Sequence, residues 1–276
     1  MRRMRNADRI RRARTTHNGV CPMKRPTHNG AILWRGPSRL DGSPIMAIIT
    51  GLRTASANPK TGDMLQTWIL RSDIHPTDAI RTGDDASICG GCPHRAQPRS
   101  GIRTCYVLPF AFNSVFDGFR RGIYPFMPPH KVASIIGGRA LRIGSYGDPG
   151  AVPVRVWRTL ANAASGWTGY THQWRRFPSL KSVCMASCDD EADRIEAVRR
   201  GWRTFTVIPV DADHAASDVQ CPASEESGKV TTCANCRLCS GAMADRANPA
   251  RSVSIHAHGK ARKRVQIQPL TIGATA

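Results

Sequence analysis

Long apolar runs are missing from this 276-residue sequence. No stretch approaches the roughly 20 apolar residues that a membrane-spanning helix needs, so we expect no membrane partner. The basic start, residues 1–14, is followed by no apolar segment, which argues against a secretory signal. We therefore expect a cytoplasmic protein, and the cytosol keeps thiols reduced. Metal ligation then explains ten cysteines better than disulfides do.

Acidic residues are also scarce, with 20 Asp and Glu against 40 Lys and Arg. Residues 1–40 hold eleven basic side chains and one acid, Asp8, which is half of the net charge of +20. We predict a disordered basic arm over residues 1–31 that contacts nucleic acid. The alternative is a start site placed too far upstream, with the folded protein beginning near Ile32. The rest, residues 32–276, is expected to form a single domain.

Four cysteines lie close together in the C-terminal part of the chain. This second cysteine group consists of Cys221, Cys233, Cys236 and Cys239, and its last three members are spaced Cys-x2-Cys-x2-Cys. Zinc ribbons use two separate Cys-x2-Cys pairs, whereas this closer run is typical of ferredoxin-like clusters. The pattern favours a 4Fe–4S cluster, with zinc as the alternative.

Three further cysteines, Cys89, Cys92 and Cys105, make up the first cysteine group. Three thiolates on a 4Fe–4S cluster leave one iron open for a substrate or cofactor. His94 or a water molecule as a fourth ligand would instead make a zinc site. A structural role without metal is the third interpretation, because the spacing Cys-x2-Cys-x12-Cys is not diagnostic.

The apolar pattern predicts an α/β fold. Short apolar runs at residues 45–52 and 64–70, separated by turn residues, predict an N-terminal β-hairpin. Helices at 154–165 and 189–200 then alternate with five strands, at 140–146, 167–172, 182–187, 203–210 and 252–258. This alternation predicts a parallel sheet with helical crossovers, either open or as a complete or partial (β/α) barrel. The second cysteine group lies in a predicted insert, about residues 215–245.

Polar side chains follow the predicted parallel strands. Function in such folds collects where the strands end, and these positions hold Asp148, His172, Cys188 or Asp189, Asp211 and His258. We name Asp148 and His172 as candidate catalytic residues. The turn Gly147-Asp148-Pro149 presents a carboxylate and free N–H groups, so Gly147 and Asp148 are candidate cofactor-binding residues. The basic run Lys260–Arg264 is a candidate phosphate contact, with a solvated edge as the alternative.

Several motifs resemble a poorly characterised family of phage and prophage proteins. The resemblance covers roughly residues 32–258, and six segments carry it: Ile32–Gly42, Thr61–Arg71, Ile88–Arg95, Gly144–Pro149, Tyr170–Trp174 and Cys221–Ser224. The resemblance implies a phage-related origin and therefore the host cytoplasm. It implies no particular activity.

The layout is also similar, more distantly, to radical S-adenosylmethionine enzymes. In that comparison Cys89, Cys92 and Cys105 correspond to the open cluster, and the second cysteine group to an auxiliary cluster. The turn Gly147-Asp148-Pro149 would lie where such enzymes hold their cofactor. The Cys-x3-Cys-x2-Cys loop usual in that superfamily is absent from this sequence. The assignment of S-adenosylmethionine as a cofactor therefore lacks its usual motif.

The leading hypothesis is therefore an iron–sulfur enzyme that cleaves S-adenosylmethionine and acts on a nucleotide or nucleic-acid-related substrate. An electron donor is then an expected partner of the enzyme. The alternative is a non-enzymatic protein in which two zinc sites stiffen a nucleic-acid-binding surface. A redox or regulatory cluster protein that does not use S-adenosylmethionine is the third possibility.

Overall fold

The computed structural model describes residues 26–56, 58–96, 101–241, 251–259 and 262–265. Most of the predicted arm, residues 1–25, lies outside this part of the chain, as do Lys260 and Ala261. No helix among the described residues is long and apolar enough to cross a bilayer.

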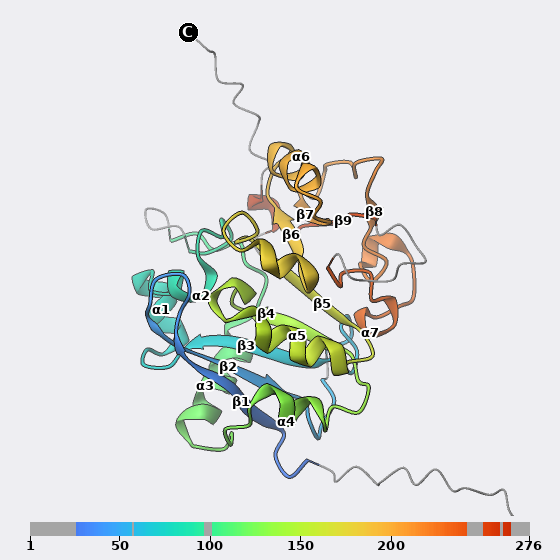
Figure 1. Ribbon diagram of the computed structural model, residues 1–276. Helices are drawn as coiled ribbons and strands as arrows, with labels where there is room; N and C mark the ends of the chain where they lie inside the picture. Colours follow the sequence, from blue (N-terminus) through green and yellow to red (C-terminus); the bar gives the residue numbers. More distant parts are fainter. Residues whose placement is uncertain (1–25, 57, 97–100, 242–250, 260–261, 266–276) are drawn as a thin grey trace, which may run out of the picture.

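A nine-stranded sheet organises the described residues (Figure 1). Its spatial order is β1-β2-β3-β4-β5-β6-β7-β9-β8. The strands are β1 Gly30–Pro37, β2 Pro44–Thr50, β3 Leu65–Arg71, β4 Leu141–Tyr146, β5 Trp167–Thr171, β6 Met185–Cys188, β7 Thr204–Ile208, β8 Val219–Gln220 and β9 Val253–His256. The first three are antiparallel, and every ladder from β3 onward is parallel. The predicted hairpin and parallel sheet are thus confirmed.

Chain order and spatial order coincide from β3 to β7. Each connection leads to the neighbouring strand. Because these strands are parallel, their carboxyl ends all lie along one edge of the sheet. The sheet ends at β1 and β8, and the described residues contain no ladder between those two strands. Closure into a barrel stays a prediction.

The helices connect and cover this sheet. They are α1 Pro76–Thr82, α2 Ala86–Cys89, α3 Pro109–Arg120, α4 Pro129–Ala133, α5 Val154–Ala163, α6 Glu191–Arg199 and α7 Cys233–Cys236. Helix α5 forms as its pattern predicted: Trp157, Leu160 and Ala161 are buried on one face. Figure 1 shows α4 and α5 beside each other in front of the sheet. Trp157 also donates from Nε1 to the Pro149 carbonyl, 2.9 Å away, which links the core to the end of β4.

Strand β1 was not predicted. It begins at Gly30, so the last residues of the expected arm belong to the sheet. Gly30, Gly36 and Pro37 obscure the strand pattern. Such residues are tolerated because β1 is an edge strand, whose only ladder among the described residues is with β2, besides a single bridge between Ile32 and Phe126. A Cβ at Gly30 would lie 2.6 Å from the Ile49 carbonyl oxygen, so the close approach of the two strands requires glycine there.

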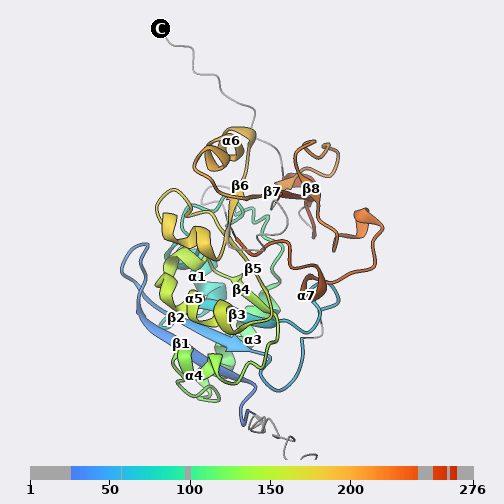
Figure 2. The ribbon, with the colours of Figure 1, turned by 45° about the vertical axis from the view of Figure 1, so that its right-hand side comes forward.

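The insert lies between β7 and β9, as predicted, and contributes β8 and α7. It does not project freely: Cys233 and Ala234 donate backbone hydrogen bonds to Lys60 and Thr61, at 2.9 and 3.2 Å. Gly169 of β5 donates to the Cys239 carbonyl at 3.0 Å. Figures 1 and 2 show α7 and β8 along one side of the molecule. The second cysteine group is therefore fixed against the parallel sheet.

Candidate metal and substrate site

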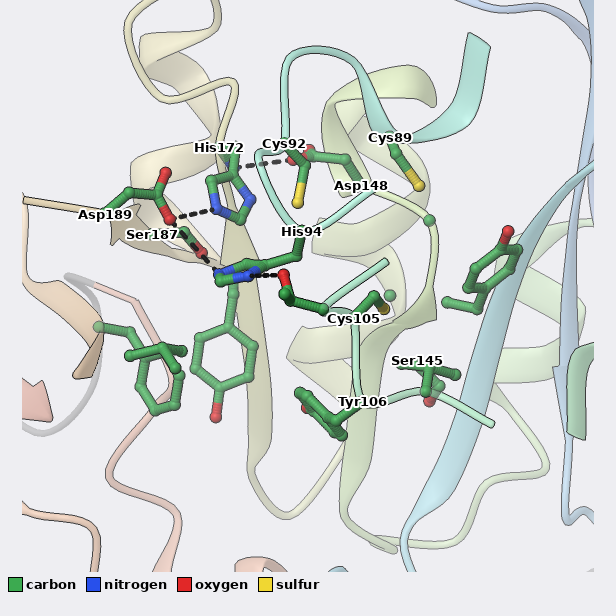
Figure 3. A pocket seen from close by; sticks show the side chains of 18 of the residues that line it. Cys89, Cys92, His94, Cys105, Tyr106, Ser145, Asp148, His172, Ser187 and Asp189 are labelled. Atoms are coloured by element: carbon green, nitrogen blue, oxygen red, sulfur yellow. Dashed lines mark hydrogen bonds and ion pairs between the residues drawn. The ribbon is translucent and has the colours of Figure 1, made fainter. Parts of the chain in front are cut away.

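A cavity of about 160 Å³ lies at the carboxyl ends of β4, β5 and β6 (Figure 3). We call it the rim cavity. The walls combine strand ends with the loop of the first cysteine group and include Cys89, Cys92, His94, Cys105, Asp148, His172, Cys188 and Asp189. Residues predicted from two separate arguments, the cysteine spacing and the strand ends, thus line one space.

The three thiols of the first cysteine group interact with one another. Cys89 ends α2, and burial raises the pKa of its thiol well above its usual value, with the charges of Cys92 and Cys105 adding to this effect. Cys105 is brought to the same wall by its backbone N–H, which donates to the His94 carbonyl at 2.9 Å. Gly90 turns the chain with φ of 60°, where a Cβ would collide with the Gln173 side chain. The loop is therefore tightly packed against β5.

Arg95 holds this loop in place. Its guanidinium donates to the Asp85 carboxylate at 2.6 Å and to the carbonyls of Gly83 and Gly90 at 2.7 and 3.0 Å. The Asp85 side chain is only 3% exposed. Because a buried carboxylate needs a charged partner, this ion pair links the loop geometry to the stability of the fold.

Asp148 connects β4, β5 and the cysteine loop. Its carboxylate accepts hydrogen bonds from Gly150 N and the Thr171 hydroxyl, both at 2.7 Å, and from His172 N at 2.8 Å. Its own N–H donates to the Ile88 carbonyl at 2.6 Å. Burial raises its pKa, although these hydrogen bonds oppose that rise. The predicted catalytic residue is thus bonded as a positioning group; a chemical role for it stays a prediction.

Gly147 takes a φ of 82°, and a Cβ there would lie 2.6 Å from Cβ of Ile69. This close approach to β3 sets the direction of the turn that carries Asp148 into the cavity wall. Binding of a cofactor by Gly147 and Asp148 stays a prediction.

His172 extends from the end of β5 toward Asp189, at the end of β6. Its Nε2 lies 3.2 Å from Asp189 Oδ1. Burial lowers the pKa of His172, but the Cys92 charge and the Asp189 hydrogen bond outweigh burial and raise it well above its usual value. His94 Nε2 lies 3.5 Å from the same Asp189 oxygen. The partnership of Asp189 with two histidines was not foreseen, although its place directly after a strand had marked it as a rim residue.

In the second cysteine group, Cys221 and Cys239 pack in one apolar cluster. Burial raises the pKa of Cys239 to about 12; a hydrogen bond with Tyr170 opposes the rise, and the charges of Cys221, Cys233 and Cys236 add to it. Tyr170 also lines the rim cavity, so one side chain connects the two metal-binding candidates.

Arg203 anchors the second group. Its guanidinium donates to the carbonyls of Leu238, Gly241 and Arg251 at 2.6, 3.0 and 2.8 Å. It is buried and has no carboxylate partner within the described part of the chain. Its charge is thus left to act on the Cys239 thiol nearby.

A larger cavity of about 780 Å³ adjoins the rim cavity and is lined by Cys221 and Cys233. We call it the insert cavity. The two spaces share Tyr106, Arg142, Tyr170, Phe205, Val207 and His258 as lining residues. A drug-sized ligand needs roughly 300–1,000 Å³, which the insert cavity offers and the rim cavity alone does not. The geometry thus suits a substrate in the insert cavity that reaches into the rim cavity.

Four basic side chains, Lys60, Arg142, Lys229 and Arg262, line the insert cavity together with one acidic side chain, Glu225. Arg142, on β4, donates to the Tyr106 hydroxyl at 2.7 Å and makes no ion pair with any described residue. Lys60 Nζ lies 2.9 Å from His258 Nε2. Cations without carboxylate partners favour an anionic ligand. From the predicted basic run, Arg262 reaches this wall.

The spacing of the thiols tests which metal group they fit. Two sulfurs bound to one tetrahedral zinc ion lie about 3.8 Å apart, because each Zn–S bond is about 2.3 Å. Within the described residues, three metal-ligating atoms come within 4.8 Å of one another only at His94, His172 and Asp189. No three cysteine sulfurs of the described residues come that close together, and whether the two groups bind iron–sulfur clusters or zinc stays a prediction.

Comparisons of the chain with protein-family models, curated proteins and solved structures find no match.

Proposed function

We propose that the protein is an iron–sulfur enzyme, similar to the radical S-adenosylmethionine enzymes, that acts on an anionic nucleotide or nucleic-acid-related substrate. The observation that carries the proposal is the convergence of Cys89, Cys92 and Cys105 on the cavity at the strand ends. Three thiolates can hold a 4Fe–4S cluster with one iron free, and these three cysteines line a cavity at the strand ends, where α/β enzymes bind their substrates. The sheet would then be a partial (β/α) barrel.

When bound, an open 4Fe–4S cluster supplies the electron that cleaves S-adenosylmethionine and yields a radical able to abstract hydrogen. The chain's own residues hold and orient the reactants. Asp148 fixes the turn after β4 and the start of the β5 loop, which keeps Gly147 and the His172 backbone in place. The second cysteine group borders the insert cavity, where a second cluster would relay electrons or contact the substrate.

The substrate class follows from charge. Arg142 and Lys60 face the insert cavity without carboxylate partners among the described residues, so they suit phosphate oxygens. Arg262 adds a third cation from the predicted phosphate-contacting run. Free cysteines at nine described positions require a reducing compartment, which we propose is the cytoplasm, that of the host if the gene is phage-derived. A cellular electron donor is then required.

The test is conversion of S-adenosylmethionine to 5′-deoxyadenosine by anaerobically prepared, chemically reduced protein. We expect product from the wild type and background levels from Cys89→Ala. Cys184→Ala is the matched control, because Cys184 is buried and belongs to neither group. A wild type that carries a cluster yet forms no 5′-deoxyadenosine would contradict the proposal and leave a redox or regulatory protein.

A second candidate is a zinc-stabilised nucleic-acid-binding protein without enzymatic activity. The observation that favours it is the exposed turn Arg262–Arg264, where three successive basic residues lie beside the insert cavity. Phosphate contacts of this kind make binding strongly salt-dependent. Colourless protein with about two zinc ions per chain and salt-sensitive binding of an oligonucleotide would favour this candidate.

A further inference from the structure

Three potential metal ligands meet in the rim cavity outside both cysteine groups. His94 comes from the cysteine loop, His172 from the end of β5 and Asp189 from the end of β6. Both histidine Nε2 atoms face one oxygen, Asp189 Oδ1, at 3.5 and 3.2 Å (Figure 3). Three segments that are distant in the sequence thus direct one donor atom each toward a common point.

The separations match those of ligands on one ion. Two donor atoms bound to a tetrahedral ion at about 2.05 Å lie about 3.3 Å apart. The distances from Asp189 Oδ1 to the two histidine nitrogens fall on either side of that value, and all three donor atoms lie within 4.8 Å of one another. The cysteine groups do not meet this criterion among the described residues, so the triad differs from them in kind.

The contact on the other ring nitrogen of His94 has the arrangement found around metal-bound histidines. His94 Nδ1 lies 2.9 Å from the Thr104 hydroxyl, which leaves Nε2 as the nitrogen that faces Asp189. If Nδ1 carries the proton and donates it to Thr104, the lone pair of Nε2 points at a carboxylate oxygen. A cation between the two atoms removes that repulsion. A hydrogen-bonding partner on the second nitrogen is also what fixes the orientation of a metal-binding imidazole.

We propose that His94, His172 and Asp189 bind a single divalent transition-metal ion, zinc or iron(II), with an open coordination position toward the rim cavity. Two imidazoles and one carboxylate are ligands that suit both ions. Three protein ligands leave a position for water or a substrate oxygen, which the ion would polarise. This site uses no cysteine as a ligand, although it borders the first cysteine group in the rim cavity.

The experiment compares full-length wild type with His94→Ala and Asp189→Asn, all prepared anaerobically and dialysed against micromolar zinc. Metal content is measured by mass spectrometry and acid-labile sulfide by a colorimetric assay. His130→Ala and Asp213→Asn are matched controls, because both side chains belong to exposed residues away from the cavity. We expect the wild type and both controls to hold one more ion than the two triad variants, with equal sulfide in all five proteins.

The sulfide measurement distinguishes failure of the triad site from failure of the proposed iron–sulfur function. If zinc occupies the cysteine groups, sulfide is absent and the iron–sulfur function fails, but the difference of one ion still supports the triad site. Equal metal content in the wild type and in both triad variants would overturn the site, whatever the sulfide content.

A variant that keeps all three ligands covers the case in which the triad variants do not fold. Thr104→Val keeps the ligands and removes the hydroxyl that orients His94, so zinc affinity should fall about 10- to 100-fold. Unchanged affinity in this variant, together with a wild-type melting temperature that zinc does not raise, would also count against the site.

Discussion

An arginine side chain holds each of the two cysteine groups, and the two arginines differ in whether a carboxylate neutralises them. Arg95 clamps the first group and Arg203 the second, each through carbonyl oxygens of the loop that carries the thiols. Arg95 is neutralised by Asp85 at 2.6 Å, whereas Arg203 has no carboxylate partner in the described residues. The second group thus lies beside an uncompensated buried cation and the first does not.

This difference indicates how each group is stabilised. The loop that carries the first cysteine group belongs to the main fold. The buried Arg95–Asp85 ion pair anchors it, and the neighbouring Asp148 accepts a hydrogen bond from Thr171 of β5. Cys221 and Cys239 of the second group pack in a small separate apolar cluster with Val253 and Ile255, whereas Cys233 packs against another small cluster. We expect the position of the second group to depend on Arg203 and on whatever the thiolates bind. An anionic cluster on Cys239 would provide the charge that Arg203 lacks. We therefore expect the first site to be preformed and the second to depend on its ligand.

The largest expected effect is that of Arg95→Met. It leaves the buried Asp85 carboxylate unpaired, and breaking such a pair costs about 3–5 kcal/mol of the free energy of unfolding. Chemical denaturation measures the change. Arg81→Met, on the exposed surface of α1, is the control and should change little. If Arg95→Met is as stable as the wild type, the first loop is not anchored as described.

Arg203→Met should have a smaller effect on the fold and a selective effect on the second centre. It removes charged donors from three carbonyls, and we expect a loss of about 1.5–3 kcal/mol. Iron content should fall by half, because only the second cluster loses its support. Arg199→Met, an exposed change on α6, is the control. An equal loss of both centres would show that the two groups are not independent.

Arg142→Met tests the space between the two groups. Its guanidinium is shared by both cavities, so removing it should weaken binding of adenosine monophosphate by about 1.5 kcal/mol, roughly tenfold. Titration calorimetry at low and moderate salt measures this loss, and Arg155→Met, on the exposed side of α5, is the control. Affinity that is equal in both variants would remove the argument for an anionic substrate.

The sequence predicts most of the sheet because its strands are buried on both faces or end in recognisable turns. The hairpin, five parallel strands and α5 all form within a few residues of the predicted limits. The strand predicted at 182–187 begins only at Met185, because Ser182 ends a 3₁₀ turn, Pro178–Ser182. Strand β1 was missed because its glycines and proline mask the pattern of an edge strand.

The site could be predicted in position but not in detail. Asp148 and His172 were identified because each lies at the end of a predicted strand, and both do line the rim cavity. The bonding of Asp148 to Thr171, and the meeting of two histidines at Asp189, depend on side chains brought together only by the crossovers. The charge of Arg142 is informative only once its lack of a partner is known. Such pairings carry no signal in sequence spacing.

The most direct test of the account is metal and sulfide analysis of anaerobically prepared full-length protein. If both groups hold 4Fe–4S clusters, we expect about eight irons with matching acid-labile sulfide and a broad absorption band at about 400 nm. Replacing Cys92 with Ala should halve both values and leave the second group occupied. Colourless protein with about two zinc ions bound by the cysteines and no sulfide would contradict the central claim that both cysteine groups hold iron–sulfur clusters.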